Sequence, residues 1–296
     1  MGKTVMKKKI KLADIIIYMI VIALALACLL PLLNMVAVSF SNSAAATAGR
    51  VGIIPVDFTV NSYTKLLKEA QYWRSLMISF VRTVLGTVIN IVLVIIMAYP
   101  LSKSTREFRA QKIYMRAVLF AMLFNGGMIP TYLVVNKLGL CDTLWSLILP
   151  SAVGVGNVIL LMNFFRSVPK ELEEATEIDG ANPFQTLWNV FIPMSKPCIA
   201  TIILFCAVGH WNDYFTGILY ISKIRNYPLQ TYIQSVTASF DISRVTDPKK
   251  IQEYLTISEK TLNAAKIVVS TLPLMVIYPF VTKYFKDGIV VGAVKE

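Results

Sequence analysis

Residues 169–193, PKELEEATEIDGANPFQTLWNVFIP, form an acidic stretch between two long apolar runs. Ser167 can cap the start of a helix, and Pro169 suits its first turn. Gly180 can adopt the left-handed conformation in which helices commonly end. Asn182 can then cap a second helix. The stretch therefore predicts two short helices joined by a tight corner.

The second of these helices is predicted to carry an apolar face. Pro183 fits its first position, where a missing N–H costs nothing. Leu187, Val190 and Phe191 then recur at helical spacing. Pro193 is expected to end the helix where the next apolar run begins.

The composition indicates a membrane protein. The 296 residues are 56% hydrophobic and 16% charged, with a mean hydropathy of +0.62, whereas soluble domains carry about 25% charged residues. Crossing a bilayer takes ~20 apolar residues. We expect an all-α polytopic protein in which 1–296 form one transmembrane domain, the loop 166–196 carries the hairpin, and six helices span about 15–40, 76–101, 117–136, 143–165, 197–222 and 262–282.

The distribution of Lys and Arg predicts the orientation. Basic residues gather in the N-terminal tail and in the loop 103–116, and cytoplasmic loops are enriched in them. Both termini and the hairpin are therefore expected in the cytoplasm, with 41–75 and 223–261 outside. The same rule accounts for the net charge of +12 without a nucleic-acid partner.

The sequence predicts neither a metal nor a cofactor bound by this chain. Its four cysteines form no CxxC pair, and His210 is the single histidine, outside any HExxH motif. No GxxxxGK[ST] phosphate loop is present, so we do not expect the chain to hydrolyse ATP.

The acidic hairpin suits a protein partner better than a lipid surface. Interfacial anchor helices usually carry Lys and Arg on their polar face, whereas Glu171, Glu173 and Glu174 crowd the first helix. A helix that merely anchors the loop is the alternative interpretation.

The hairpin also resembles a known motif. Glu174-Ala175-Thr176, three residues, Gly180, nine residues and then Val190-Phe191-Ile192-Pro193 resembles the EAA loop of ABC importer permeases, with Thr in place of the second Ala. The resemblance implies coupling helices that seat in a cleft of an ATPase subunit. The residues to which it assigns ATPase coupling are Glu173, Glu174, Ala175, Thr176, Asp179, Gly180, Ala181 and Pro183.

The resemblance extends to nearly the whole chain. NGGMIPTYLVVNKLGL at 125–140, the run 147–175 and GHWNDYFTGILY at 209–220 are similar to carbohydrate-uptake permeases, above all the second permease of maltose-type importers. This likeness implies the type I ABC importer architecture in a bacterial plasma membrane. It also implies as partners, besides the lipid bilayer, a second homologous permease, two cytoplasmic ATPases that use ATP and Mg²⁺, and an extracytoplasmic solute-binding protein.

The resemblance further implies the cargo and mechanism. We expect an oligosaccharide to be moved by alternating access. The alternatives are a non-sugar solute such as an amino acid, a polyamine or a phosphonate, and an ATP-independent carrier.

Asp213 is the clearest case of an ionisable residue inside an apolar run. An ionisable residue there costs roughly 2.5–3.5 kcal/mol on insertion scales, so it needs a partner or a function. Asp213 and Asn212 could hold a neighbouring helix, or the group Trp211, Asn212, Asp213 and Tyr214 could contact a sugar.

Other polar residues extend this candidate path. Asn125 and the following Gly-Gly are expected to break the third span. Irregular backbone in a membrane is covered by protein or lines a cavity, so the break could form a cavity wall or hinge, or it could serve helix packing. Tyr132 and Asn90 could face the path. Arg82 is a further candidate for the path, although it is expected to extend to the outer membrane interface instead. The candidate path or gate residues are Asn90, Asn125, Tyr132, Trp211, Asn212, Asp213 and Tyr214.

Overall fold

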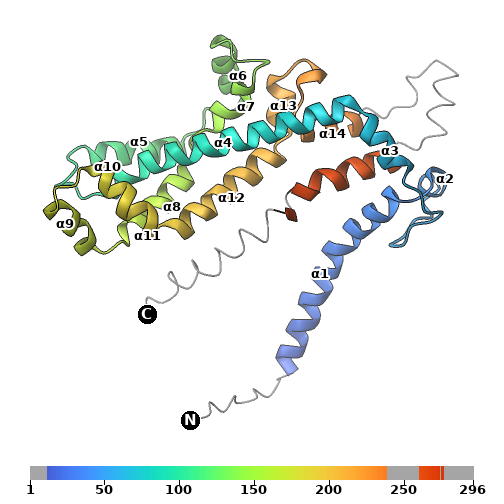
Figure 1. Ribbon diagram of the computed structural model, residues 1–296, viewed down its shortest axis with the longest axis horizontal. Helices are drawn as coiled ribbons and strands as arrows, with labels where there is room; N and C mark the ends of the chain where they lie inside the picture. The colour runs from blue at the N-terminus through green and yellow to red at the C-terminus, as the bar shows by residue number, and fades with distance from the viewer. Residues whose placement is uncertain (1–11, 239–259, 274, 277–296) are drawn as a thin grey trace. The chain divides into compact units, whose positions relative to one another are not determined.

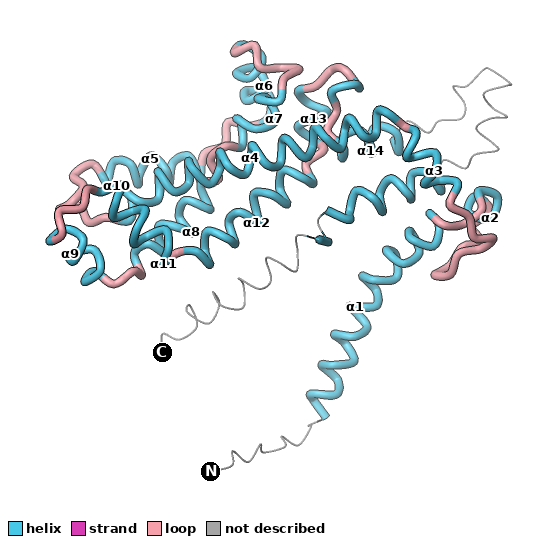
Figure 2. The backbone as a smooth tube through the Cα atoms, in the orientation of Figure 1, coloured by secondary structure: helices cyan, strands magenta, loops and turns pink. Residues whose placement is uncertain are grey.

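The computed structural model describes residues 12–238, 260–273 and 275–276. In this part of the chain the backbone forms helices and loops, with no strand (Figure 2). The expected all-α class is therefore confirmed. The described residues group into two compact units, 12–69 with 260–269 and 70–238 with 270–276. That 1–296 form one domain stays a prediction.

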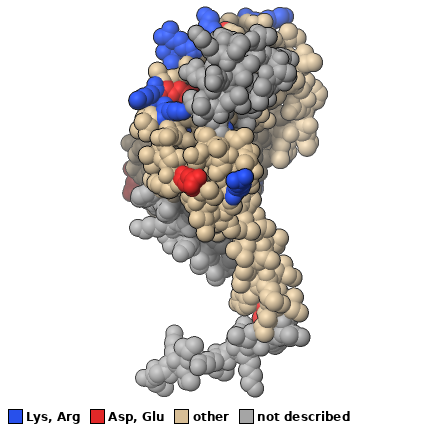
Figure 3. Space-filling view, turned by 90° about the vertical axis from the view of Figure 1, so that its right-hand side faces the viewer, with Lys and Arg blue, Asp and Glu red and all other residues tan. Residues whose placement is uncertain are grey.

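The first unit is dominated by α1 (Leu12–Ser39), followed by α2 (Ser43–Thr47) and α3 (Asn61–Lys68). Residues 260–269 are also helical. Asp14 is the one charged residue within α1, and the surface of this helix is uncharged along nearly its whole length (Figure 3). A helix that is apolar all round is typical of a membrane span.

Side-chain contacts fix the loops that follow α1. The Nδ2 of Asn34 donates to the carbonyl oxygens of Val51 at 3.0 Å and Gly52 at 2.7 Å. The ring of Phe40 stacks on Tyr63 with centroids 4.7 Å apart. The end of α1 and the following loops therefore form a folded unit.

The second unit is built on one long helix, α4 (Ala70–Ser102). Thirty-three residues at 1.5 Å each give it a length of about 50 Å. Figure 1 shows α9, α10 and α11 toward one end of α4, with α13 and α14 toward the other. The remaining elements of this unit are α5 (Gln111–Leu123), α6 (Met128–Lys137), α7 (Leu144–Ile148), η1 (Leu149–Ser151), α8 (Val155–Arg166), α9 (Lys170–Ile178), α10 (Pro183–Thr186), η2 (Leu187–Phe191), α11 (Ile192–Met194), α12 (Lys196–Asn212), α13 (Phe215–Tyr220), η3 (Ile224–Asn226) and α14 (Leu229–Ala238).

The core of this unit lies where α8 and α12 pack lengthwise against α4. Apolar residues spaced by three or four positions place one face of each helix in this core. Its fully buried members include Val94, Ala98, Val158, Leu161 and Ile202. The result is a three-helix scaffold from which the shorter elements extend.

Two uninterrupted helices are long and apolar enough to cross a membrane, Asp14–Ser39 and Ala70–Ser102. They correspond to the first two expected spans, the second starting six residues earlier than expected. In the described part of the chain the number of spans rises to five at most, if each bent helix pair counts as one. The sixth expected span, 262–282, lies partly outside the described residues.

The third span is interrupted, as expected from Asn125 and the Gly-Gly that follows it, and the fourth and fifth spans are bent as well. The third span, 117–136, is bent by 113° between α5 and α6, where Gly127 has a φ of 90°. The fourth is bent by 50° between η1 and α8, and the fifth begins after an 82° bend and ends at Asn212. Pro150 and Pro193, which lack a backbone donor, lie near the latter two bends.

α14 is the last helix before the first gap in the described residues. Leu229, Thr231, Tyr232 and Ile233 are buried, and α14 packs on α4. The backbone N–H of Leu229 donates to Ser79 Oγ at 2.7 Å. This helix therefore covers the three-helix scaffold near the start of α4.

Gly86 allows α4 and α12 to approach each other closely. A Cβ at this position would lie 2.5 Å from His210 Nε2, whereas a Cβ at Gly209 would meet no atom within 4 Å. We predict that Gly86→Ala destabilises the protein by about 1–3 kcal/mol, because the added methyl overpacks the interface. The measurement is the midpoint of thermal unfolding in detergent, with Gly209→Ala as the matched control. Equal midpoints for the two variants would contradict the prediction.

Candidate functional site

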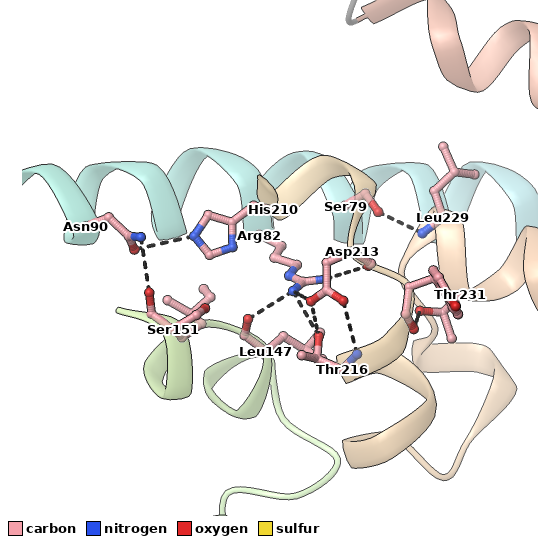
Figure 4. A network of polar contacts seen from close by, with 12 residues as sticks. Ser79, Arg82, Asn90, Leu147, Ser151, His210, Asp213, Thr216, Leu229 and Thr231 are labelled. Carbon is pink, nitrogen blue, oxygen red and sulfur yellow. Dashed lines mark hydrogen bonds and ion pairs between the residues drawn. The ribbon is translucent and has the colours of Figure 1, made fainter. Parts of the chain in front are cut away.

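Arg82 is the centre of a buried polar network between α4, α7 and the break between α12 and α13 (Figure 4). Its guanidinium forms an ion pair with the carboxylate of Asp213. It also donates to the carbonyl oxygens of Asp213 at 3.0 Å and Leu147 at 3.2 Å, and to Thr216 Oγ1 at 3.0 Å. We call Arg82, Asp213, Thr216 and the Leu147 carbonyl the Arg82 network.

Asp213 lies where the helix of the fifth span stops. Its backbone is extended, with φ −74° and ψ 112°. Its carboxylate accepts hydrogen bonds from the backbone N–H of Thr216, at 3.2 Å, and from the Thr216 hydroxyl. The same carboxylate thus caps α13 and neutralises Arg82. This is the interhelical contact that one interpretation of Asp213 predicted, while contact with a sugar stays a prediction.

The expectation that Arg82 extends to the membrane interface is wrong. Its side chain is 1% exposed. An arginine within an apolar helix can reach water or find an internal counter-charge, and here Asp213 supplies the counter-charge. Its Nε is buried and has no hydrogen-bond partner among the described residues. The network therefore satisfies the guanidinium only in part.

Asn90 links the same helices one step further along α4. Its Nδ2 donates to the carbonyl oxygen of Ser151 at 3.3 Å, and its Oδ1 lies 3.4 Å from His210 Nε2. Asn90 and His210 are both buried. The candidate residues Asn90 and Asp213 therefore lie on one side of α4. Asn90 contacts His210 in the last turn of α12, and Asp213, just past that helix, contacts Arg82.

Three candidates next to Asp213 point to different surroundings. Trp211 is 4% exposed, and its Nε1 donates to the carbonyl oxygen of Ser270 at 3.1 Å. Asn212, the last residue of α12, is exposed, as is the side chain of Tyr214. In this conformation Trp211 is therefore a packing residue, and only Asn212 and Tyr214 present surface to a ligand.

Asn125 and Tyr132 lie apart from the Arg82 network. The Oδ1 of Asn125 accepts from the Gly127 N–H at 2.9 Å and so stabilises the bend between α5 and α6. The ring of Tyr132 stacks on Tyr220, with centroids 6.2 Å apart. Tyr132 also lines a pocket of about 430 Å³ together with Phe215 and Ile218 of α13.

The hairpin forms at the predicted corner. Gly180 has a φ of 74°, and Asn182 accepts from the backbone N–H of Gln185 at 2.9 Å, while the Gln185 side chain accepts from the Asn182 N–H at 2.8 Å. This reciprocal pair is a capping box, and Pro183 occupies the first position of α10. Leu187 and Phe191 are buried, as expected of the apolar face.

Two details of the hairpin differ from the prediction. The Ser167 hydroxyl donates back to the carbonyl oxygen of Phe164 at 2.7 Å and ends α8, so it does not cap α9. The helix also continues past Pro193 to Met194, and the chain turns at Ser195. A proline at the first position of a helical turn needs no N–H partner, so Pro193 does not stop the helix.

Thr176 and Glu173 connect α9 to other elements. The Thr176 hydroxyl lies 3.1 Å from that of Thr186 on α10, so the departure from Ala at this motif position supplies a bond between the two helices. Glu173 forms an ion pair with Lys103, just beyond the end of α4.

The outer surface of the hairpin combines charge with exposed apolar side chains. Ile178 is 86% exposed, Phe184 79% and Trp188 72%. Phe184 and Trp188 are four residues apart and lie on one face of a helix, and exposed large apolar side chains on one face can form a binding site for another protein. The remaining coupling candidates also lie at or near this surface: Glu174, Ala175, Asp179, Ala181 and Pro183.

Two carboxylates outside the spans have a lowered pKa. The side-chain hydroxyl of Ser104 donates to Glu107 and is the largest cause of its lowered pKa. The hydroxyl of Ser222, at 2.6 Å, is the largest cause of the lowered pKa of Asp142. Both groups are therefore ionised at neutral pH and stabilise the loops in which they lie.

Sequence reasoning did not assign Lys103, Thr216 or the exposed residues Ile178, Phe184 and Trp188. For Arg82 there was a usable signal, since an Arg in one apolar run and an Asp in another suggest a pair. Lys103 gave no such signal, because it belongs to a basic loop. Across the residues that the structure describes, no group of three metal-ligating side chains is present.

Residues 90–291 match the family described as "Binding-protein-dependent transport system inner membrane component". The chain therefore belongs to this family. It is a membrane-embedded permease subunit of an ABC importer, and it works in a complex with other subunits.

Relatives and a solved structure support the assignment. The chain is 41% identical to Protein LplC of Bacillus subtilis (strain 168), over 90% of this chain and 89% of that protein. It is 38% identical to the polygalacturonan/rhamnogalacturonan transport system permease protein YtcP of the same organism, over 97% and 99%. A chain of a bacterial ABC transporter involved in the import of the acidic polysaccharide alginate has a TM-score of 0.84 and 34% identity, covering 94% of this chain and 100% of that one.

The ion pair of Arg82 and Asp213 should be essential to folding. We predict that Asp213→Leu lowers the free energy of unfolding by about 3–5 kcal/mol, because it leaves a buried cation without its counter-charge. The double variant Arg82→Leu/Asp213→Leu should be more stable than Asp213→Leu alone. The measurement is thermal unfolding in detergent of the two single variants and the double variant. Strictly additive losses would contradict the prediction.

Proposed function

We propose that the chain is one of two permease subunits in an ABC importer that takes up an acidic oligosaccharide. The second permease would be a homologue, and of two cytoplasmic ATPases using ATP and Mg²⁺ one would dock on the hairpin of this chain. A solute-binding protein would deliver the cargo from outside. Both termini would then lie in the cytoplasm of a bacterial cell.

The hairpin is the observation that carries this proposal. It projects carboxylates together with Ile178, Phe184 and Trp188, which a protein partner would bury. The long helix α4 connects this end of the subunit with the broken fifth span. Such an arrangement suits a subunit that changes shape when an ATPase moves, because the moving surface is attached to a rigid element.

The cargo class is supported by the relatives and by local charge. One relative is named for polygalacturonan and rhamnogalacturonan, and the solved structure concerns the acidic polysaccharide alginate. In this chain Arg74 lies near the end of α4 away from the hairpin, and its Nε donates to the carbonyl oxygen of Arg225 at 2.9 Å, so two basic residues lie together there. A positive potential there would attract a uronate.

The transported solute can be identified with the complex purified through a tag on this chain. After reconstitution in nanodiscs, ATP hydrolysis is measured with the binding protein and with galacturonan, alginate or neutral oligosaccharides. We expect stimulation by one of the acidic series. Stimulation by neutral sugars only would overturn the acidic cargo. Stimulation by an amino acid, polyamine or phosphonate would overturn a sugar cargo, and uptake without an ATPase would indicate an independent carrier.

The docking role of the hairpin makes a separate prediction. Trp188→Ser should reduce the ATPase that co-purifies with the chain by about tenfold or more, because a well-packed interfacial aromatic contributes 2 kcal/mol or more. Its own stability should be unchanged, since the ring is exposed in the isolated subunit. Quantitative mass spectrometry gives the ratio of ATPase to permease.

Trp145→Ser is the matched control, because Trp145 is also exposed but lies on α7. An equal loss of ATPase in both variants, or no loss in Trp188→Ser, would contradict docking at the hairpin.

A further inference from the structure

Lys103 connects the end of α4 with both parts of the hairpin. Its ammonium forms an ion pair with Glu173 of α9. It also lies 4.3 Å from the centroid of the Phe191 ring, at the end of η2, and 4.5 Å from that of Tyr99. Charge and ring contacts together restrict the ammonium to one position. Lys103 therefore contacts the helix before the corner and the helix after it.

This contact is more than a solvated surface ion pair. Exposed pairs contribute roughly 0–1 kcal/mol, but the side chain of Lys103 is only 12% exposed and that of Glu173 22%. The rings under the ammonium are fixed in turn, because Tyr99 and Phe191 meet edge to face with centroids 5.2 Å apart. A displacement of Glu173 would therefore act on α4 directly.

Two pockets border the Lys103–Glu173 ion pair. A pocket of about 550 Å³ lies between the end of α4 and the hairpin, and another of about 660 Å³ lies between α4, α8 and α9. Lys103 and Glu173 line both pockets. Where a helix borders open space, fewer contacts share a displacement, so the ion pair carries more of it.

The same helix holds the break in the fifth span. Arg82 lies 20 residues before Ser102, which is about 30 Å along α4 at 1.5 Å per residue. It contacts Asp213, where α12 ends, and Thr216 of α13. α4 is therefore ion-paired to the hairpin near one end and to the broken span farther along its length.

We propose that Lys103 is a positioning residue that transmits movement of the hairpin, through α4 and Arg82, to α13. This inference rests on the proposed function, since it takes an ATPase to be what moves the hairpin. It assigns the transmission to the Lys103–Glu173 ion pair. The covalent connection from η2 into α12 would then not be sufficient to transmit this movement.

The test follows α13 without needing the cargo. Ile218 of α13 is 50% exposed, so Ile218→Cys can be labelled with a maleimide. The background carries Cys28→Ala and Cys141→Ala, because Cys198 and Cys206 are buried. The purified complex, with its ATPase, is labelled with and without a non-hydrolysable ATP analogue. We expect the analogue to change the labelling rate by about fivefold or more, the lower range of allosteric coupling.

Two matched pairs of variants identify the ion pair. Lys103→Met and Glu173→Gln should abolish the response while the ATPase still co-purifies. Lys103→Arg keeps the charge and should keep the response, and so should Glu171→Gln, which removes an exposed carboxylate of the same helix.

Four results would overturn the inference. The response could be absent in the parent, or it could persist in Lys103→Met and Glu173→Gln. It could also be lost equally in Lys103→Met and Lys103→Arg, which would mean that shape and not charge matters, or lost in Glu171→Gln. Failure of the proposed function gives a different result, because then no ATPase co-purifies with the parent chain.

Discussion

An arginine inside an apolar helix must have a counter-charge, and much of the second unit follows from this requirement. Arg82 has its counter-charge in Asp213. The carboxylate that reaches the guanidinium lies where α12 stops and α13 begins, and it also accepts from the backbone N–H of Thr216. The carbonyl of Leu147 is drawn into the network from α7. The Arg82–Asp213 ion pair thus lies where α4, α7 and the break between α12 and α13 meet.

The other organising element is α4 itself. α8 and α12 pack along it, and the charged contacts of Arg82 and Lys103 lie roughly two-fifths of the way along it and at its far end. Beyond Asn90 the buried face of α4 is apolar and closely packed, as the burial of Val94 and Ala98 shows. A long rigid helix with polar contacts at separate points can move as one body. This is the mechanical property that transmission of movement along the subunit requires.

The hairpin was largely predictable, because its signals are local. Gly180, Asn182 and Pro183 each act on the backbone within a few residues, and all three lie as their chemistry predicts. The break after Asn125 was predictable for the same reason. The long-range pair was not predictable. The apolar run shows that Arg82 lies in a span, but it does not show that its side chain meets Asp213. The bends of the fourth and fifth spans were missed because hydropathy registers the apolar run and not the direction of the helix axis.

The separation of Arg82 and Asp213 in sequence has a consequence during synthesis. The two residues are 131 positions apart, and ribosomes add roughly 5–20 residues per second. The arginine is thus made about 7–26 s before its counter-charge exists. During that interval α4 must enter the bilayer with an unmatched cation, at a cost of roughly 2.5–3.5 kcal/mol. The apolar residues around Arg82 therefore have to carry the helix through the translocon before the fold can stabilise it.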